Sequence, residues 1–166
     1  MGKVNTKVIA PQGNGSTTEW TASEGDSHNC VDAMTECYGD TKYIHISNFN
    51  EIHFFTTPDS GYSTENIRGI TLFSRCKDGG SAIDHGVYLG FFISNIEYWS
   101  DPIMITSSST YLVIKNRWAV NPHTGLNWTQ SDIVNLEFGI KSAKIIGGYD
   151  GNPRCSQLQL IMWCSD

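Results

Sequence analysis

Apolar and polar residues alternate along most of the chain, with the period of a β-strand that buries one face. Near the C-terminus, Leu158, Leu160 and Met162 share one face. Gln157 and Gln159 occupy the other. The same alternation predicts strands at 8–10, 43–47, 51–56, 67–77, 86–99, 103–106, 110–120, 136–146 and 154–164. So many short strands in one chain predict an all-β fold, an antiparallel two-sheet β-sandwich of the jelly-roll type.

A single short helix interrupts this pattern. Thr129 precedes Gln130, Ser131 and Asp132 with the spacing of a helix N-cap, and Ile133 follows as the first apolar helical residue. We predict a helix of about two turns here, closing one end of the sandwich.

The residues around this helix suggest how the end is closed. Asn121 leads into Pro122 and Gly125, which shape a turn off a strand end. Trp128 is placed to plug the open end of the core, and Gly139 allows the next strand to pass close to its neighbour. These residues predict a structural lid, with no chemistry of its own.

Two histidines are the best metal candidates in the sequence. If 43–47 and 51–56 form a hairpin, His45 faces His53 across it, and two imidazoles can hold a metal. No third ligand is marked, so packing of the two rings is the favoured interpretation. Asp150-Gly-Asn152 is likewise interpreted as a turn and not a calcium loop. We predict no metal and no cofactor.

The length and charge of the chain limit its possible domain organisation and partners. Its 166 residues suit one domain, covering 1–166, with an irregular polar segment at about 11–40 anchored by Trp20. The net charge of −6 and the scattered basic residues argue against a nucleic-acid partner. The apolar run at 8–10 is too short for a signal peptide, and no stretch is long enough for a membrane span.

The five cysteines leave at least one thiol unpaired within a monomer. Cys30 and Cys37 are close enough in sequence to pair, although reduced thiols are the favoured interpretation. Cys155 and Cys164 flank one predicted strand that is about 30 Å long, so they cannot bond to each other.

No catalytic signature is present, neither a phosphate loop, nor a nucleophile elbow, nor a zinc-protease motif. We therefore predict no catalytic residues and a function in binding. Exposed aromatic rings can stack on sugars, and four residues are candidates for such a platform: Tyr98, Trp99, Trp118 and Trp128. In a sandwich, however, tryptophan more often packs in the core.

Two stretches carry a resemblance to a known group of proteins. The first runs from Gly15 through Trp20 to Gly25 and continues at 39–44. The second is Asn121-Pro-His-Thr-Gly-Leu-Asn-Trp-Thr-Gln-Ser-Asp-Ile133, ending near Gly139. Together they resemble a jelly-roll module of minor structural proteins in tailed phages. The resemblance implies a virion protein, made in the host cytoplasm: a capsid decoration protein, or a tail or fibre accessory.

The leading prediction is therefore a virion structural protein that binds other virion proteins and itself as a homo-oligomer. If Leu158 and Leu160 face the core, Ile161 and Trp163 point outward and form a candidate interface. The alternative is a carbohydrate-binding β-sandwich module of the adhesin kind, with glycans as partners.

Overall fold

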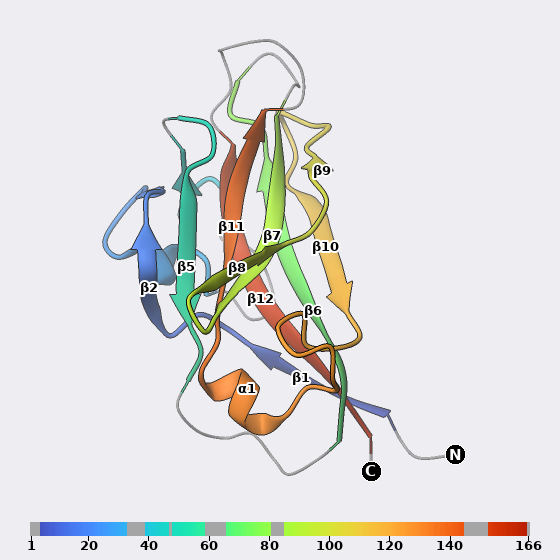
Figure 1. The fold of residues 1–166 in the computed structure, drawn as a ribbon. Helices are drawn as coiled ribbons and strands as arrows, with labels where there is room; N and C mark the ends of the chain where they lie inside the picture. The colour runs from blue at the N-terminus through green and yellow to red at the C-terminus, as the bar shows by residue number, and fades with distance from the viewer. Residues whose placement is uncertain are drawn as a thin grey trace.

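The computed structural model describes residues 4–32, 39–46, 48–58, 66–80, 85–144 and 153–165. Two antiparallel sheets lie face to face with the core between them, and one short α-helix lies at one end (Figure 1). The chain is a jelly-roll β-sandwich, which confirms the predicted fold class.

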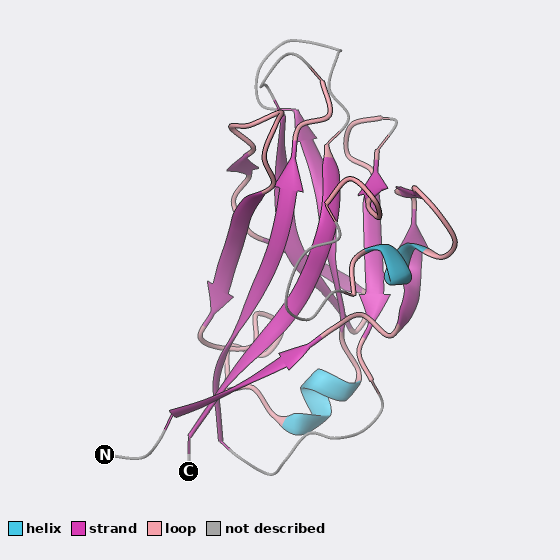
Figure 2. Cartoon of the chain, turned by 180° about the vertical axis from the view of Figure 1, so that it is seen from behind, coloured by secondary structure: helices cyan, strands magenta, loops and turns pink. Residues whose placement is uncertain are grey.

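Sheet A contains the two longest strands, and it also contains the first and the last strand of the chain. Its order is β10 (Leu112–Trp118), β6 (Asn66–Lys77), β12 (Arg154–Ser165), β4 (Ile44–His45) and β3 (Thr21–Ala22), and β1 (Val4–Ile9) also pairs with β12. Figure 2 shows β6, β12 and β1 crossing this side of the molecule. Because β12 pairs with β6 along its whole length, these two strands form the centre of the sheet.

Sheet B is the opposite layer. Its order is β2 (Gly13–Thr18), β5 (Ile52–Thr56), β11 (Glu137–Lys144), β7 (His85–Ile93) and β8 (Ile96–Trp99), and β9 (Ile103–Met104) pairs with β7. In Figure 1, β8 crosses in front of β7 and β11, on the side away from the core. The edge of sheet B therefore curls back over its own outer face.

The core follows the predicted alternation. Leu158, Leu160 and Met162 of β12 are buried between the sheets, and Phe91 and Phe138 face them from sheet B. Full burial of an aliphatic or aromatic side chain of this size contributes roughly 1.5–3 kcal/mol. The inward positions of β12 are thus assigned correctly from sequence, although Gln157 and Gln159 on its other face are also buried.

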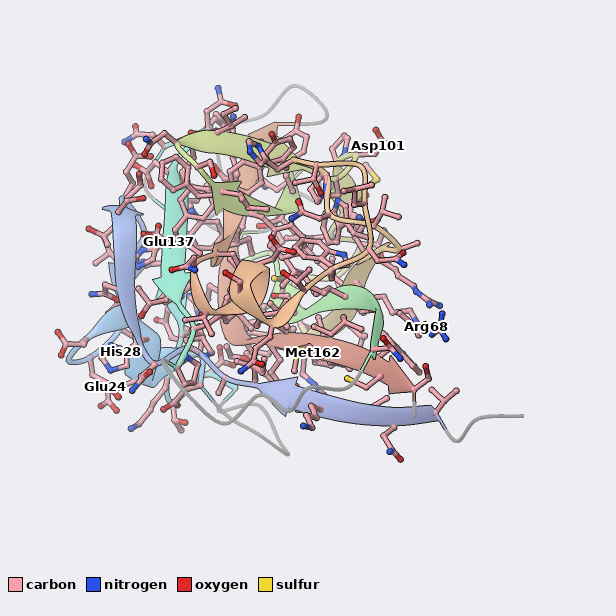
Figure 3. All side chains as sticks on the ribbon, turned by 60° about the horizontal axis from the view of Figure 1, so that its bottom comes forward. Glu24, His28, Arg68, Asp101, Glu137 and Met162 are labelled. Atoms are coloured by element: carbon pink, nitrogen blue, oxygen red, sulfur yellow. The ribbon has the colours of Figure 1, made fainter. Side chains whose placement is uncertain are left out.

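The predicted lid is present. Helix α1 (Gln130–Val134) begins at Thr129, whose hydroxyl accepts from the backbone N–H of Asp132 while the Asp132 carboxylate accepts from that of Thr129. Ile133 is its buried residue. Figure 3, seen towards this end, shows α1 between the layer of β8 and the layer of β12 and β1. The capping box explains why so short a helix forms.

The turn before the helix also has the predicted form. Gly125 has φ of +72°, which favours glycine, and its N–H donates to the carbonyl of Asn121 at 2.8 Å. Asn121 is buried, and Pro122 follows it at the start of the turn. Trp128 is only 3% exposed, and its indole N–H donates to the carbonyl of Trp118 at 3.2 Å. The predicted burial of Trp128 is confirmed.

Segment 86–99, predicted as one long strand, is a hairpin. Ser94 and Asn95 have φ of +51° and +65°, and they connect β7 to β8. Two consecutive positive φ values are typical of the two-residue turns that match the twist of paired strands. The prediction of a single strand was wrong because apolar residues flank Ser94-Asn95 on both sides.

The segment at 11–40 is more regular than predicted. It contains β2, β3 and a 3₁₀ helix at Ser27–Cys30. Strand β2 consists entirely of glycine, serine, threonine and asparagine, so it has no apolar pattern that would predict it from sequence. It is held by backbone pairing with β5. Trp20 is the expected anchor, since it is 2% exposed and its N–H donates to the carbonyl of Glu51.

The described cysteines are buried and are not in disulfide bonds: Cys30, Cys76, Cys155 and Cys164. Cys155 and Cys164 lie on the same strand and are not bonded, as predicted. Cys37, the proposed partner of Cys30, lies outside the described residues.

The hairpin that placed His45 opposite His53 does not form. His45 is on β4 in sheet A, and His53 is on β5 in sheet B. The chain crosses between the layers after β4 instead of turning back, so the two rings do not share a sheet. His53 is 1% exposed and stacks on Phe55 with ring centroids 4.6 Å apart. It is a core residue.

This burial predicts a specific pH dependence. Desolvation lowers the pKa of His53 from 6.5 to about 4, partly offset by the backbone of Trp20. Between these pH values the unfolded chain binds the proton more readily, so stability is full above about pH 6.5 and falls as the pH drops towards 4. The loss expected from His53 is about 3 kcal/mol at 1.36 kcal/mol per pKa unit.

Urea unfolding at pH 7 and pH 4.5 measures this loss. His53→Phe keeps an aromatic ring against Phe55 but removes the titrating group. We expect the stability difference between the two pH values to shrink in the variant by roughly 2 kcal/mol or more. Equal pH dependence in parent and variant would show that His53 does not carry it.

Candidate functional site

An unusual row of residues crosses the outer face of sheet B. Phe54 on β5 pairs with Gly139 on β11, Gly139 pairs with Gly90 on β7, and Gly90 pairs with Trp99 on β8. The two central positions of this row carry no side chain. The indole of Trp99 lies back across them and stacks on Phe54, with ring centroids 5.2 Å apart and an interplanar angle of 21°.

The glycines make this arrangement possible. A Cβ atom at Gly90 would lie 2.3 Å from Cε3 of Trp99, and one at Gly139 would lie 2.2 Å from the carbonyl oxygen of His53. Both distances are far below van der Waals contact. Any other residue at either position would therefore lift the indole off the sheet or push the strands apart.

Two further aromatic residues extend this surface. Phe92 lies one row away, with its ring centroid 5.5 Å from that of Phe54. Tyr88 lies one row away on the other side, opposite Lys141. Trp99, Phe92 and Tyr88 are half-buried, while Phe54 beneath them is fully buried. We call Phe54, Tyr88, Phe92 and Trp99 the aromatic platform.

Charged side chains of both signs border the platform. Glu97 accepts the indole N–H of Trp99 at 2.8 Å, which fixes the orientation of the ring. Glu137 accepts from the backbone and hydroxyl of Ser16 at 2.8 and 2.7 Å. The ammonium of Lys141 lies 5.7 Å from the Trp99 ring centroid and 5.9 Å from that of Tyr88. Hydrogen-bond acceptors and a donor thus surround an apolar floor.

The four residues predicted to form a sugar platform lie in different parts of the structure. Trp99 belongs to the aromatic platform. The rings of Trp118 and Trp128 pack edge-on against Phe91, which places them at the core. Tyr98 packs against the core with its hydroxyl 2.9 Å from Nδ1 of His123. The residues around Trp99 were not predicted from sequence. The signal that could have indicated them was the presence of glycines in the middle of two predicted strands, where a close approach of another group is common.

The candidate interface residues lie on the other side of the molecule. Ile161 and Trp163 are half-buried on the outer face of sheet A, opposite to the buried Leu158, Leu160 and Met162. Their predicted direction is confirmed. The indole N–H of Trp163 donates to Oγ1 of Thr71 at 2.9 Å. Their role in contacts between proteins stays a prediction.

Among the described residues, one aspartate and one histidine lie within salt-bridge distance of each other. Oδ2 of Asp78 lies 2.7 Å from Nδ1 of His85, and both side chains are fully buried. The other Asp78 oxygen accepts from the backbone N–H of Gly80. Because no substrate reaches this pair from solvent, it acts as an internal brace between β7 and the end of β6.

The described residues contain no group of three or more histidine, cysteine, aspartate or glutamate side chains placed to hold a metal ion. The predicted turn at Asp150–Asn152 lies outside them. Within the same part of the chain, no helix has the length and apolar character required to span a bilayer.

The chain matches no known protein family and no curated protein. Among solved structures it is similar to a xylan-binding module named CBM15, with a TM-score of 0.48 and 10% identity over 95% of this chain and 97% of that one. It is also similar to the CBM22-1 xylan-binding domain of Paenibacillus barcinonensis Xyn10C, with a TM-score of 0.46 and 8% identity over 97% and 95%. These values are too low to bear on function, and the resemblance to phage modules stays a prediction.

Proposed function

We propose that this chain is a carbohydrate-binding domain that holds sugar rings of a neutral polysaccharide against the aromatic platform. The observation that supports it best is the indole of Trp99, which lies against the sheet over Gly90 and Gly139. A pyranose ring presents apolar C–H groups on its face, and these groups pack well on a flat aromatic surface.

The platform is organised before any ligand arrives. The hydrogen bond to Glu97 and the stack on Phe54 restrict the Trp99 side chain, so little conformational entropy remains to be lost on binding. Half-buried aromatic groups beside polar side chains are typical of small-molecule sites. A preformed surface of this kind suits the weak but specific binding of a polymer.

The charges around the platform indicate a neutral ligand. Glu97 and Glu137 offer acceptors, and Lys141 offers donors, on the same face. Sugar hydroxyls both donate and accept, so they satisfy groups of both signs. A strongly charged polymer would be repelled either by the two glutamates or by the lysine, depending on the sign of its charge.

Replacing Trp99 tests the proposal. We expect Trp99→Ala to weaken binding at least tenfold in calorimetry or affinity electrophoresis with neutral arabinoxylan, mannan and hydroxyethylcellulose. Trp99→Phe should retain part of the affinity because it keeps a ring over Gly90. Trp163→Ala, on the opposite face, should leave binding to these neutral polymers unchanged.

The proposal fails in either of two cases. One is that none of the polymers binds the parent protein. The other is that Trp99→Ala binds as tightly as the parent while its circular dichroism and melting temperature show a folded domain.

The virion role implied by the phage resemblance is a second candidate function. The outward position of Ile161 and Trp163 is the observation in its favour. This virion role requires the outer face of sheet A to contact protein. Light scattering tests whether this face contacts a second copy of the chain.

A further inference from the structure

The outer face of sheet A differs in charge from the rest of the molecule. The chain as a whole has a net charge of −6. Five of its eleven lysine and arginine residues alternate with the inward residues of β6, β10 and β12 and so lie on this side of the sheet: Arg75, Lys77, Lys115, Arg117 and Arg154. Lys77 is buried there, and the other four are partly or fully exposed. A basic surface has therefore been concentrated on one side of an acidic protein.

Only part of this charge is compensated. Asp40 lies 2.6 Å from the ammonium of Lys77 and 3.2 Å from the guanidinium of Arg154, and its hydrogen bond with Lys77 is the main cause of its lowered pKa. No carboxylate among the described residues lies within salt-bridge distance of Arg75, Lys115 or Arg117. Nε of Arg75 is buried without a hydrogen-bond partner there. Three cations remain available to an anion.

Two of these cations, Lys115 and Arg117, adjoin a hollow. Thr71, Lys115, Asn116, Arg117 and Trp163 line a volume of about 380 Å³ on this face. The size falls in the range of small-molecule sites, roughly 300–1,000 Å³. Lys115 and Arg117 are exposed and lie two residues apart on β10, so both side chains point to the same side.

Trp163 provides an ordered apolar surface in the hollow. Its N–H is held by Thr71, and the guanidinium of Arg117 lies 5.5 Å from the ring centroid. A cation at this distance is attracted to the ring, which keeps Arg117 near the hollow. The site thus combines a fixed aromatic ring with two exposed cations, Lys115 and Arg117.

We propose that this hollow binds an acidic sugar of a polysaccharide, with its carboxylate at Lys115 and Arg117 and its ring against Trp163. This site goes beyond the proposed function, because it lies on the opposite sheet and uses a different ligand charge. The two sites do not depend on each other, so either proposal can fail alone.

Other occupants fit the face less well. A free phosphate is much smaller than 380 Å³ and makes no use of Trp163. A nucleic-acid strand requires a longer track of cations and is repelled by the overall charge of −6. A second copy placed by two-fold symmetry would bring like charges together around Lys115 and Arg117.

Binding to one polymer with and without its charge tests the proposal. We expect polygalacturonate to bind the parent protein, and fully methyl-esterified polygalacturonate, which lacks the negative charge, to bind at least tenfold more weakly. Raising the salt from 50 to 500 mM should weaken the first interaction and leave the second unchanged.

Variants locate the site. Lys115→Gln with Arg117→Gln should weaken polygalacturonate binding at least tenfold, and Lys115→Arg with Arg117→Lys should restore it. Lys42→Gln with Arg68→Gln removes the same charge elsewhere and should have little effect; Figure 3 shows Arg68 projecting at the edge of the molecule. Trp99→Ala should bind polygalacturonate as the parent does.

Four outcomes would overturn the proposal. They are equal binding of charged and esterified polymer, unchanged binding by the glutamine double variant, binding of single-stranded DNA but not polygalacturonate, and self-association through this face. Light scattering detects the last as a dimer or larger species that Trp163→Asp converts to a monomer.

Discussion

Trp128→Ala is expected to lower the free energy of unfolding by about 3–5 kcal/mol, the range for large buried aromatic residues. Trp128 is 3% exposed and packs edge-on against Phe91, with ring centroids 5.4 Å apart. The variant would leave a cavity at the end of the core and free the carbonyl of Trp118, which now accepts the indole N–H. The short helix α1 cannot move in to fill it, since the capping box fixes where it begins.

Urea unfolding followed by circular dichroism measures this effect. Leu126→Ala is the matched control, because Leu126 lies two residues earlier in the same turn and is 70% exposed. It should change stability by less than about 0.5 kcal/mol. A Trp128→Ala midpoint equal to that of the parent would show that the core does not depend on this plug.

Much of the fold was predictable from sequence, because most strands have one apolar side. Strands such as β6 and β12 pack against the opposite sheet, so their inward residues repeat with period two. The lid was predictable for another reason. Pro122, Gly125 and Thr129 each act through local backbone geometry, which their identity reveals without knowledge of the tertiary fold.

The parts that were missed depend on non-local pairing. Strand β2 has no apolar face, and it forms because β5 supplies its backbone partners. The supposed hairpin of His45 and His53 obeyed the local pattern, but the chain crosses between the sheets there. Which strand pairs with which cannot be read from alternation alone.

The candidate site shows the same limit. Trp99 was a candidate from its residue type, and so were three residues that the structure places in the core or packed against it: Tyr98, Trp118 and Trp128. What distinguishes Trp99 is the register that aligns Gly90 and Gly139 beneath it. Similarly, the basic face of sheet A arises only when β10 and β12 flank β6, since its cations are scattered in the sequence.

The register at Gly139 leads to the second large effect. Gly139→Ala is expected to lower the free energy of unfolding by about 3 kcal/mol, at the upper end of the range for overpacked positions. The added Cβ would lie 2.2 Å from the carbonyl oxygen of His53 and 2.6 Å from Cδ1 of Phe54. The first neighbour is backbone, so relief requires β5 and β11 to separate where they pair.

The same substitution should also abolish binding of neutral polysaccharides, because a displaced Phe54 no longer supports the indole of Trp99. Gly13→Ala is the matched control: it adds the same methyl group in sheet B, but its Cβ lies 3.2 Å from the Thr56 hydroxyl, which can rotate away. It should be close to the parent in both urea midpoint and binding. If Gly139→Ala were as stable as Gly13→Ala and still bound arabinoxylan, the close approach at Gly139 would not be what holds the platform against the sheet.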